Sequence, residues 1–345
     1  MKTRIGMIVW GLSLASCASL PPPVTVISTS ETAPAAERRE TPGNPAIWAG
    51  GLRRDEPGLA AGGLVAGTAR GESLLVHDFQ GTLQQRVAGP PLTDLDVVGL
   101  PLEDGYSVVM GGPERAAGRT RIVLFRLDRG ADQTARRWAE IPTDLSAPAG
   151  FCMRQTRGVV QAVVIDRRGE TRQFTVTAGS AGEPVVEETR RFRVSQAGQG
   201  CAIEPDPGYV YFSHAREGFW RYRLDPSATA APVRLRAAAP HALPRSLGPA
   251  LLTEGLDRYL TSLDQDRAAF SVWRLGGDEL TWLGRFEVRE QPEGRAVRTL
   301  AGIDAYGSAV GPFPNGVVVV QDQRNDGSPN LKYVDWAEVK RALGF

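Results

Sequence analysis

The chain has 345 residues, of which 42% are hydrophobic and 23% charged, and its 40 Lys and Arg residues against 39 Asp and Glu leave a formal net charge of +1. This balance is typical of a globular protein with an ample core, and it excludes a disordered chain or a bundle of membrane helices. So small a net charge also excludes a global field that would attract nucleic acid, so any anion site must be local.

The first twenty residues have the order of an export signal. Lys2 and Arg4 precede an apolar run over residues 5–14, which is too short to remain as a transmembrane helix, and small residues follow it. The string LASC, residues 14–17, resembles the lipobox of bacterial lipoproteins, in which the cysteine is acylated and becomes the new N-terminus. Plain secretion with loss of Cys17 is the alternative.

Residue 18 is alanine rather than aspartate, which resembles the outer-membrane sorting pattern. We therefore predict a signal peptide at residues 1–16, an acylated Cys17 and a location in the cell envelope, at the outer membrane of a Gram-negative bacterium. The Pro-, Thr- and Ser-rich composition after the cysteine predicts a tether over residues 17–30. Residues 31–345 contain no internal linker and are predicted to form one domain.

The two remaining cysteines, Cys152 and Cys201, have neither CxxC nor metal-ligand spacing. An exported protein meets an oxidising compartment, so we expect them to form a disulfide, with two buried thiols as the alternative.

One pattern recurs through the chain: a β-type run ends on an apolar residue and a polar turn follows. The apolar anchors are separated by 48, 49, 48, 51 and 59 residues, and they are Phe79, Leu127, Val176, Leu224, Leu275 and Val334. A period of this size with strands throughout is typical of a β-propeller of four-stranded blades. The sequence therefore predicts an all-β fold with six blades, followed by a short C-terminal helix in WAEVKRALGF.

Familiar catalytic motifs are absent from the sequence. It contains no GxSxG, no Gly-rich GK phosphate loop, no HExxH and no Cys/His cluster. The three histidines, His77, His214 and His241, are scattered. From these motifs alone, the sequence predicts an exported propeller and does not indicate an activity.

Several longer strings resemble the β-propeller phytases, calcium-dependent enzymes that release phosphate from inositol hexakisphosphate. That family carries ETEP and, fourteen residues after its first glutamate, the proline of DDPAIW; here ETAP begins at Glu31 and NPAIW has its proline at Pro45. The strings YLTSLDQDRAAFSVW, LAGIDAYGSAVGPFPNGVVVVQD and KYVDW also resemble family motifs. The resemblance covers nearly all of the mature chain.

The resemblance implies an electrostatic mechanism. Carboxylates at one mouth of the propeller hold several Ca²⁺ ions that bind the substrate phosphates and activate a bridging water, while basic residues hold a neighbouring phosphate. By this resemblance, Arg70, Arg115 and Arg167 match basic phosphate-binding positions. Ala149 replaces a family tyrosine.

Most of the acidic positions differ from the family. Gly43 and Asn44 replace the paired aspartates before PAIW, and further acidic positions fall on Gln199, His214, Ala215, the string SLGPAL from Ser246, Thr299 and Ala301. The oxygen ligands that remain by resemblance are Glu31, Asp96, Gln265 and Asp304. Because each Ca²⁺ takes about 6 to 8 oxygens, we expect at most one structural Ca²⁺ here.

Three functions therefore remain open at this level. One is a phosphomonoester hydrolase of the phytase type, and another is a non-catalytic propeller that binds a protein partner or a phosphorylated small molecule such as an inositol phosphate. The third is a purely structural lipoprotein of the cell envelope. The sequence does not decide whether hydrolysis is retained. No nucleic acid is expected as a partner, and membrane contact is expected through the lipid anchor only.

Overall fold

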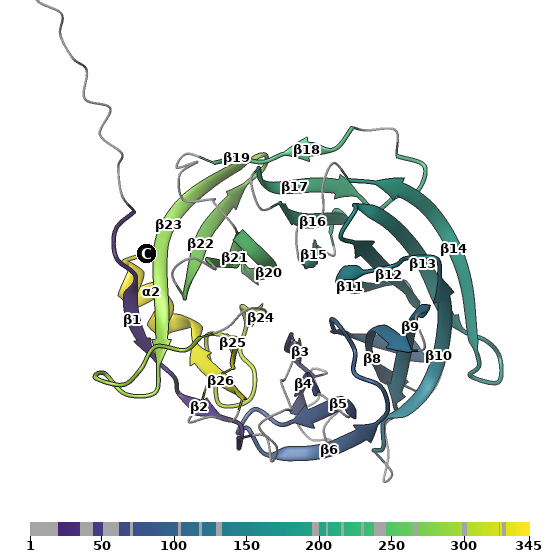
Figure 1. The fold of residues 1–345 in the computed structure, drawn as a ribbon, viewed down its shortest axis with the longest axis horizontal. Helices are drawn as coiled ribbons and strands as arrows, with labels where there is room; N and C mark the ends of the chain where they lie inside the picture. The colour runs from purple at the N-terminus through teal and green to yellow at the C-terminus, as the bar shows by residue number, and fades with distance from the viewer. Residues whose placement is uncertain are drawn as a thin grey trace, which may run out of the picture.

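The chain folds into a ring of six sheets around a central channel (Figure 1). The computed structural model describes residues 20–34, 44–50, 62–69, 72–102, 105–116, 119–128, 133–194, 200–204, 206–214, 217–228, 231–237, 246–264, 268–298, 302–323, 325 and 329–345. The predicted signal peptide, Cys17, Arg70, Gln265 and His241 lie outside these residues.

Four blades are built from consecutive antiparallel strands, which follow one another in chain order from the channel outward. Blade 1 contains β3 (Ala46–Trp48), β4 (Leu64–Ala69), β5 (Glu72–His77) and β6 (Leu83–Ala88), and blade 2 contains β7 (Asp96–Leu102), β8 (Gly105–Ala116), β9 (Arg119–Leu127) and β10 (Arg136–Thr143). Blade 3 contains β11 (Pro148–Thr156), β12 (Val159–Asp166), β13 (Glu170–Ala178) and β14 (Pro184–Arg193), and blade 4 contains β15 (Cys201–Glu204), β16 (Tyr209–His214), β17 (Gly218–Arg223) and β18 (Val233–Arg234).

The last two blades take their outer strands from elsewhere in the chain. Blade 5 contains β20 (Ser246–Glu254), β21 (Asp257–Asp264), β22 (Ala269–Gly276) and β23 (Glu279–Arg289), and its edge is covered by β1 (Val24–Ile27) and β19 (Arg236–Ala237), both parallel to β23. Blade 6 contains β24 (Ile303–Tyr306), β25 (Val317–Asp322), β26 (Asn330–Asp335) and, as its outermost strand, β2 (Ser30–Glu31).

The N-terminal strands therefore close the ring. The sequence placed residues 17–30 in a tether, but β1 and Ser30 already pair within blades 5 and 6, so the folded domain begins before residue 31. The prediction missed this because a four-residue strand that pairs with a distant edge leaves little local signal in a Pro-rich segment.

The six-fold period of the sequence is confirmed. Each of the six apolar anchors lies in the third strand of its own blade or within two residues of its end, and all six are buried. Buried apolar side chains of the described residues form six clusters, one between each pair of neighbouring blades. Burial between neighbours is what stabilises a propeller, because a single blade cannot bury both of its faces.

The C-terminal helix is also confirmed, as α2 (Trp336–Leu343). The Asp335 side chain caps its first turn by accepting a 2.9 Å bond from the Ala337 N–H, and Gly344 ends it with a φ of 79°. Trp336 and Val339 are buried on the side that packs between blades 5 and 6. No helix within the described residues is long and apolar enough to cross a membrane.

Candidate functional site

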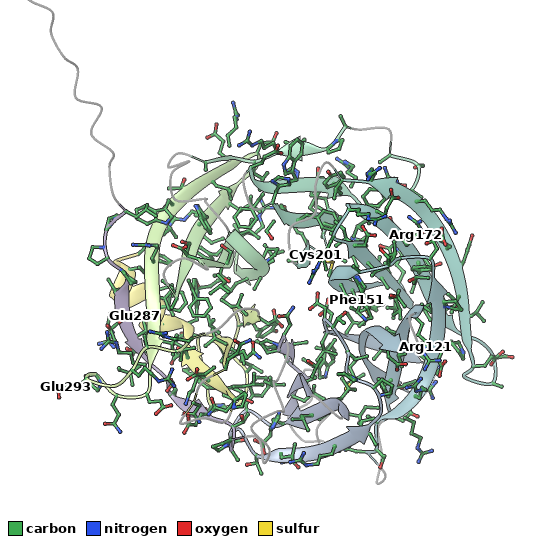
Figure 2. The ribbon with its side chains drawn as sticks, in the orientation of Figure 1. Arg121, Phe151, Arg172, Cys201, Glu287 and Glu293 are labelled. Atoms are coloured by element: carbon green, nitrogen blue, oxygen red, sulfur yellow. A yellow bond between two sulfur atoms is a disulfide. The ribbon has the colours of Figure 1, made fainter. Side chains whose placement is uncertain are left out.

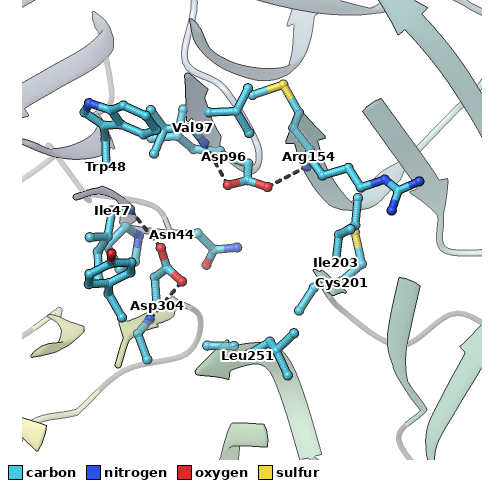
Figure 3. A pocket seen from close by; sticks show the side chains of 18 of the residues that line it. Asn44, Ile47, Trp48, Asp96, Val97, Arg154, Cys201, Ile203, Leu251 and Asp304 are labelled. Carbon is cyan, nitrogen blue, oxygen red and sulfur yellow. Dashed lines mark hydrogen bonds between the residues drawn. The ribbon is translucent and has the colours of Figure 1, made fainter. Parts of the chain in front are cut away.

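A channel of about 760 Å³ lies at the centre of the ring, lined by all six innermost strands. Figure 2 shows Phe151 and Cys201 beside the channel and Arg121 and Arg172 further out on the blades. Apolar side chains line much of it, including those of Ile47, Trp48, Val97, Ile203 and Leu251 (Figure 3).

The acidic groups of the channel gather at one end, where the innermost strands begin. We call this end the acidic mouth; it carries Asn44, Asp94, Asp96 and Asp304. Asp96 begins β7 and Asp94 lies two residues before it, and both line the channel. Figure 3 shows Asp96 and Asp304 on neighbouring parts of the wall.

Each of the three carboxylates accepts hydrogen bonds from backbone N–H groups on two blades. Asp304 accepts from its neighbour Ala305 and from Ile47 of blade 1, both at 2.8 Å. Asp96 accepts from Val97 at 2.7 Å and from Met153 of blade 3 at 2.5 Å. The carboxylate oxygens of Asp304 and Asp96 therefore form hydrogen bonds that connect the innermost strands of different blades.

Asp94 forms the same kind of link and adds another. It accepts from Leu95 at 2.9 Å and from Phe151 of blade 3 at 2.6 Å. The Asn44 amide of blade 1 donates to Asp94 Oδ1. Asn44 stands where the family resemblance places an aspartate, and an amide can donate to Asp94, whereas a second carboxylate there would repel it.

The disulfide expected from the sequence continues this series of links. Cys152 on β11 is bonded to Cys201 on β15, with 5.8 Å between their Cα atoms. Together with the polar bonds it joins the innermost strands of blades 6, 1, 2, 3 and 4 in order around the mouth.

Burial raises the pKa of all three carboxyls. Desolvation raises the pKa of Asp94 to about 6 and that of Asp304 to about 7, against the hydrogen bonds that each accepts. Asp96 is raised well above its ordinary pKa, first by desolvation and then by the negative charge of Asp304. The negative charge of a neighbouring carboxylate adds to desolvation at Asp96 and Asp304.

These residues do not fit a calcium shell of the kind that the family mechanism needs. Within the described part of the chain, no three His, Cys, Asp or Glu side chains come together as a metal-binding group. Both oxygens of each mouth carboxylate already accept backbone bonds, and the raised pKa values disfavour the charged form that Ca²⁺ requires.

Glu31 lies away from the mouth. It is on β2, the outermost strand of blade 6, whereas Asp304 is on the innermost strand of that blade. Its carboxylate pairs with the fully buried Lys332 and accepts a 3.0 Å bond from Asn330. Lys332 also pairs with Glu290. Glu31 therefore serves ring closure in this structure, and of the expected oxygen ligands that the structure describes it is not brought together with Asp96 and Asp304.

The basic positions are described in part. Arg115 is in β8, four residues beyond Gly111, which pairs with Asp96, so its backbone lies toward the acidic mouth; its side chain is outside the described part. Arg167 is in the turn between β12 and β13, where its N–H donates to the Ala147 carbonyl just before β11.

Arg167 is exposed, and no carboxylate in the described residues pairs with it. Other arginines of this blade are already matched: Arg172 and Arg191 pair with Asp144, and Arg193 with Glu170. At this corner of blade 3, on the same end of the ring as the acidic mouth, Arg167 and its exposed neighbour Arg168 are the described cations left to meet an anion from solution.

Comparison with known proteins identifies relatives over almost the whole chain. The profile of the Phytase family matches residues 7–345. The chain is 22% identical over 334 residues to a 3-phytase of Bacillus subtilis (strain 168), covering 92% of this chain and 85% of that one.

Solved structures share the fold at low identity. A lectin of Aleuria aurantia in complex with a fucosylated GlcNAc superposes with a TM-score of 0.52 at 12% identity, covering 74% of this chain and 82% of that one. A protein of unknown function from Bacteroides thetaiotaomicron gives 0.51 at 11% identity, covering 90% and 74%. At these identities the likeness concerns the fold alone.

Proposed function

Because the chain belongs to the Phytase family, we propose that it is a phytase-like propeller that binds a polyphosphorylated small molecule, such as an inositol phosphate, beside the acidic mouth. In this proposal calcium-dependent hydrolysis of phosphomonoesters is weak or lost. The observation that carries it is the state of Asp94, Asp96 and Asp304, whose oxygens accept backbone N–H bonds between blades.

Calcium-dependent catalysis is disfavoured because the mouth has too few oxygen ligands available to bind Ca²⁺. Each Ca²⁺ needs about 6 to 8 oxygens at short range, and several ions are needed to bind substrate phosphates and activate a water. Freeing Asp304 for a metal would leave the buried N–H groups of Ile47 and Ala305 without acceptors, at about 1–3 kcal/mol for each group. The carboxylates of the acidic mouth therefore stabilise contacts between blades.

The argument for phosphate binding is that Arg167 is exposed and unmatched by acid in the described residues. A charge-assisted hydrogen bond from a guanidinium contributes about 1.5–3 kcal/mol where it is partly desolvated, and less at an open surface. Arg70 and Arg115 are the further positions that the family resemblance assigns to the same role. A few such bonds support micromolar rather than nanomolar binding.

Two measurements on the purified chain test the proposal. Isothermal titration with inositol hexakisphosphate in the presence of EDTA should give measurable binding that weakens as salt rises. Phosphate release from the same compound should stay near background, with or without added Ca²⁺. Robust calcium-dependent release would refute the loss of hydrolysis, and no binding at any salt concentration would refute the ligand.

We further propose that the mature chain is a lipoprotein of the cell envelope, on the strength of the LASC string at residues 14–17. Mass spectrometry of the mature N-terminus should find an acylated Cys17, and Cys17→Ala should move the protein from the membrane fraction to the soluble fraction. Unchanged fractionation of this variant would contradict the proposed anchor.

A further inference from the structure

The described chain begins on the rim of blade 5. Leu20 is only 8% exposed and packs in the cluster between blades 4 and 5, with Phe219, Trp273 and Leu280 among its members. Burying a leucine side chain stabilises its position by about 1.5–3 kcal/mol. The segment is therefore held to the propeller from Leu20 onward.

The residues after Leu20 continue this attachment. The Pro21 carbonyl accepts a bond from Arg285, which is itself 3% exposed and paired with Asp264 at 3.1 Å. Residues 21–23 are prolines, whose rings restrict the backbone. From Val24, β1 pairs with β23. We call residues 20–31 the N-terminal strap; it follows the rim of blades 5 and 6.

The strap leaves very little chain between the fold and Cys17. Three peptide units separate Cys17 from Leu20, and fully extended they span at most about 11 Å. This is short compared with a flexible tether, which would let the ring rotate freely above its anchor. An anchor at Cys17 therefore fixes which part of the ring lies nearest the membrane.

We propose that the acylated protein stands edge-on at the lipid surface, with the rim of blade 5 around Leu20 facing the bilayer. This inference rests on the proposed lipid anchor and adds an orientation to it. Figure 1, viewed along the short axis of the ring, shows β1 and β23 at the left edge and β10 at the opposite edge. Blade 2 is then the part furthest from the membrane, and the axis of the channel lies parallel to the bilayer.

The charge of the surface beside Leu20 is consistent with an orientation that the covalent attachment at Cys17 determines. The exposed side chains of Arg236 and Glu279 pair with each other at 3.0 Å, so this part of the rim carries balanced charge. Pro21 and Pro22 are exposed and uncharged. Since the charges of this pair balance, the orientation should not depend on anionic lipid or on salt concentration.

Fluorescence quenching on vesicles tests the orientation. The full-length acylated protein is reconstituted in phosphatidylethanolamine–phosphatidylglycerol vesicles that contain a headgroup quencher. A small fluorophore is attached through a non-natural amino acid at one of three exposed positions: Glu279 on the near rim, Glu140 on the far rim of blade 2, or Arg168 near the acidic mouth. We expect quenching several-fold stronger at position 279 than at positions 140 and 168, in low and high salt.

A variant with about ten Gly and Ser residues inserted between Ser19 and Leu20 removes the short connection. It should stay on the vesicles and lose the difference between positions 279 and 140. The same insertion in the exposed turn at Leu256 is the matched control, and it should keep the difference. Equal quenching at both rims before the insertion, or strongest quenching at position 168, would overturn the proposal.

A separate measurement shows whether Cys17 carries the proposed lipid. If mass spectrometry finds no lipid on Cys17, the anchor proposal fails, and a mature chain coupled at Cys17 to a maleimide lipid then measures the orientation by the same quenching pattern. A near-rim preference in that chain supports the strap argument, and its absence refutes it.

Discussion

Asp304 Oδ2 accepts a 2.8 Å hydrogen bond from the backbone N–H of Ile47, 257 residues earlier in the chain, and so joins the last blade to the first. The same carboxylate accepts from Ala305 with its other oxygen. A side chain that the family resemblance implies as a metal ligand thus works here as a clamp between strands.

Asp304→Ala should destabilise the ring by about 2–4 kcal/mol, because two buried N–H groups lose their acceptor. The measurement is urea unfolding at about pH 4, close to the ordinary carboxyl pKa of 3.8, where the pH-linked loss of stability is still small. Asp225→Ala is the control: Asp225 also accepts a backbone bond, from Ser227 at 2.9 Å, but in an exposed turn. A loss at Asp304 no larger than at Asp225 would contradict the clamp.

The pKa of Asp304 predicts an unusual pH dependence. Its folded pKa of about 7 lies above its ordinary value of 3.8, so between these values the native state binds more protons than the unfolded chain. This contribution to stability is complete below pH 3.8 and is lost as pH rises through about 7. His77 acts in the opposite sense, since burial lowers its pKa from 6.5 to about 4.

The test compares Asp304→Asn with the unaltered chain, because His77 is common to both and its effect cancels. The amide keeps an acceptor oxygen but does not titrate. Relative to the unaltered chain, the variant should gain thermal stability as pH rises from 5 to 8. A difference that stays constant across this range would show that the carboxyl does not titrate there.

Much of the fold could be predicted from the sequence, because each blade repeats one local pattern. A strand ends on a buried apolar residue, and a polar turn follows it. Phe79, Leu127 and Val334 keep their spacing for that reason, and all three are buried. The outer strands β1 and β2 could not be recognised in this way, since what makes them strands is the distant edge that they cover.

The sequence predicted some of the residues that line the channel, but it did not predict their hydrogen-bond partners. Asp96 and Asp304 do lie on the channel, yet their partners are backbone groups of other blades. Glu31 is matched by Lys332, one of very few lysines in the chain. Asp94 was missed, because it lies in a bend before β7 and no strand pattern marks it.

Asn44→Asp should destabilise the mouth more than Asn44→Ala does. Both variants lose the amide donor to Asp94, but only aspartate adds a charge that Asp94 repels. Because the pKa of Asp94 is about 6, the gap between the two variants should be widest at pH 8 and narrow at pH 5. Thermal unfolding of both variants at the two pH values measures the gap, and equal losses at pH 8 would exclude repulsion.

Removing the disulfide by Cys152→Ala together with Cys201→Ala should lower stability by up to about 4 kcal/mol, since the bond closes a long loop in the unfolded chain. The cysteines are 49 residues apart and join the innermost strands of blades 3 and 4. Unfolding in urea with and without a reductant checks this: the reductant should destabilise the unaltered chain and leave the double variant unchanged. Stability indifferent to the reductant in both would contradict the prediction.

Arg167→Ala should weaken binding of inositol hexakisphosphate by about fivefold, the equivalent of about 1 kcal/mol. Arg157 supplies a matched control, because it is an exposed arginine in the β11–β12 turn at the opposite end of the same blade. Removing either residue takes one positive charge from the chain, so a non-specific attraction between the ring and a polyanion would weaken equally in both variants. A local site requires a loss at Arg167 alone, and that loss should shrink as salt screens the guanidinium. Isothermal titration of the two variants at low and high salt distinguishes these outcomes: equal losses would mean that Arg167 is only part of the general surface charge, and unchanged affinity in Arg167→Ala would remove this residue from the proposed site.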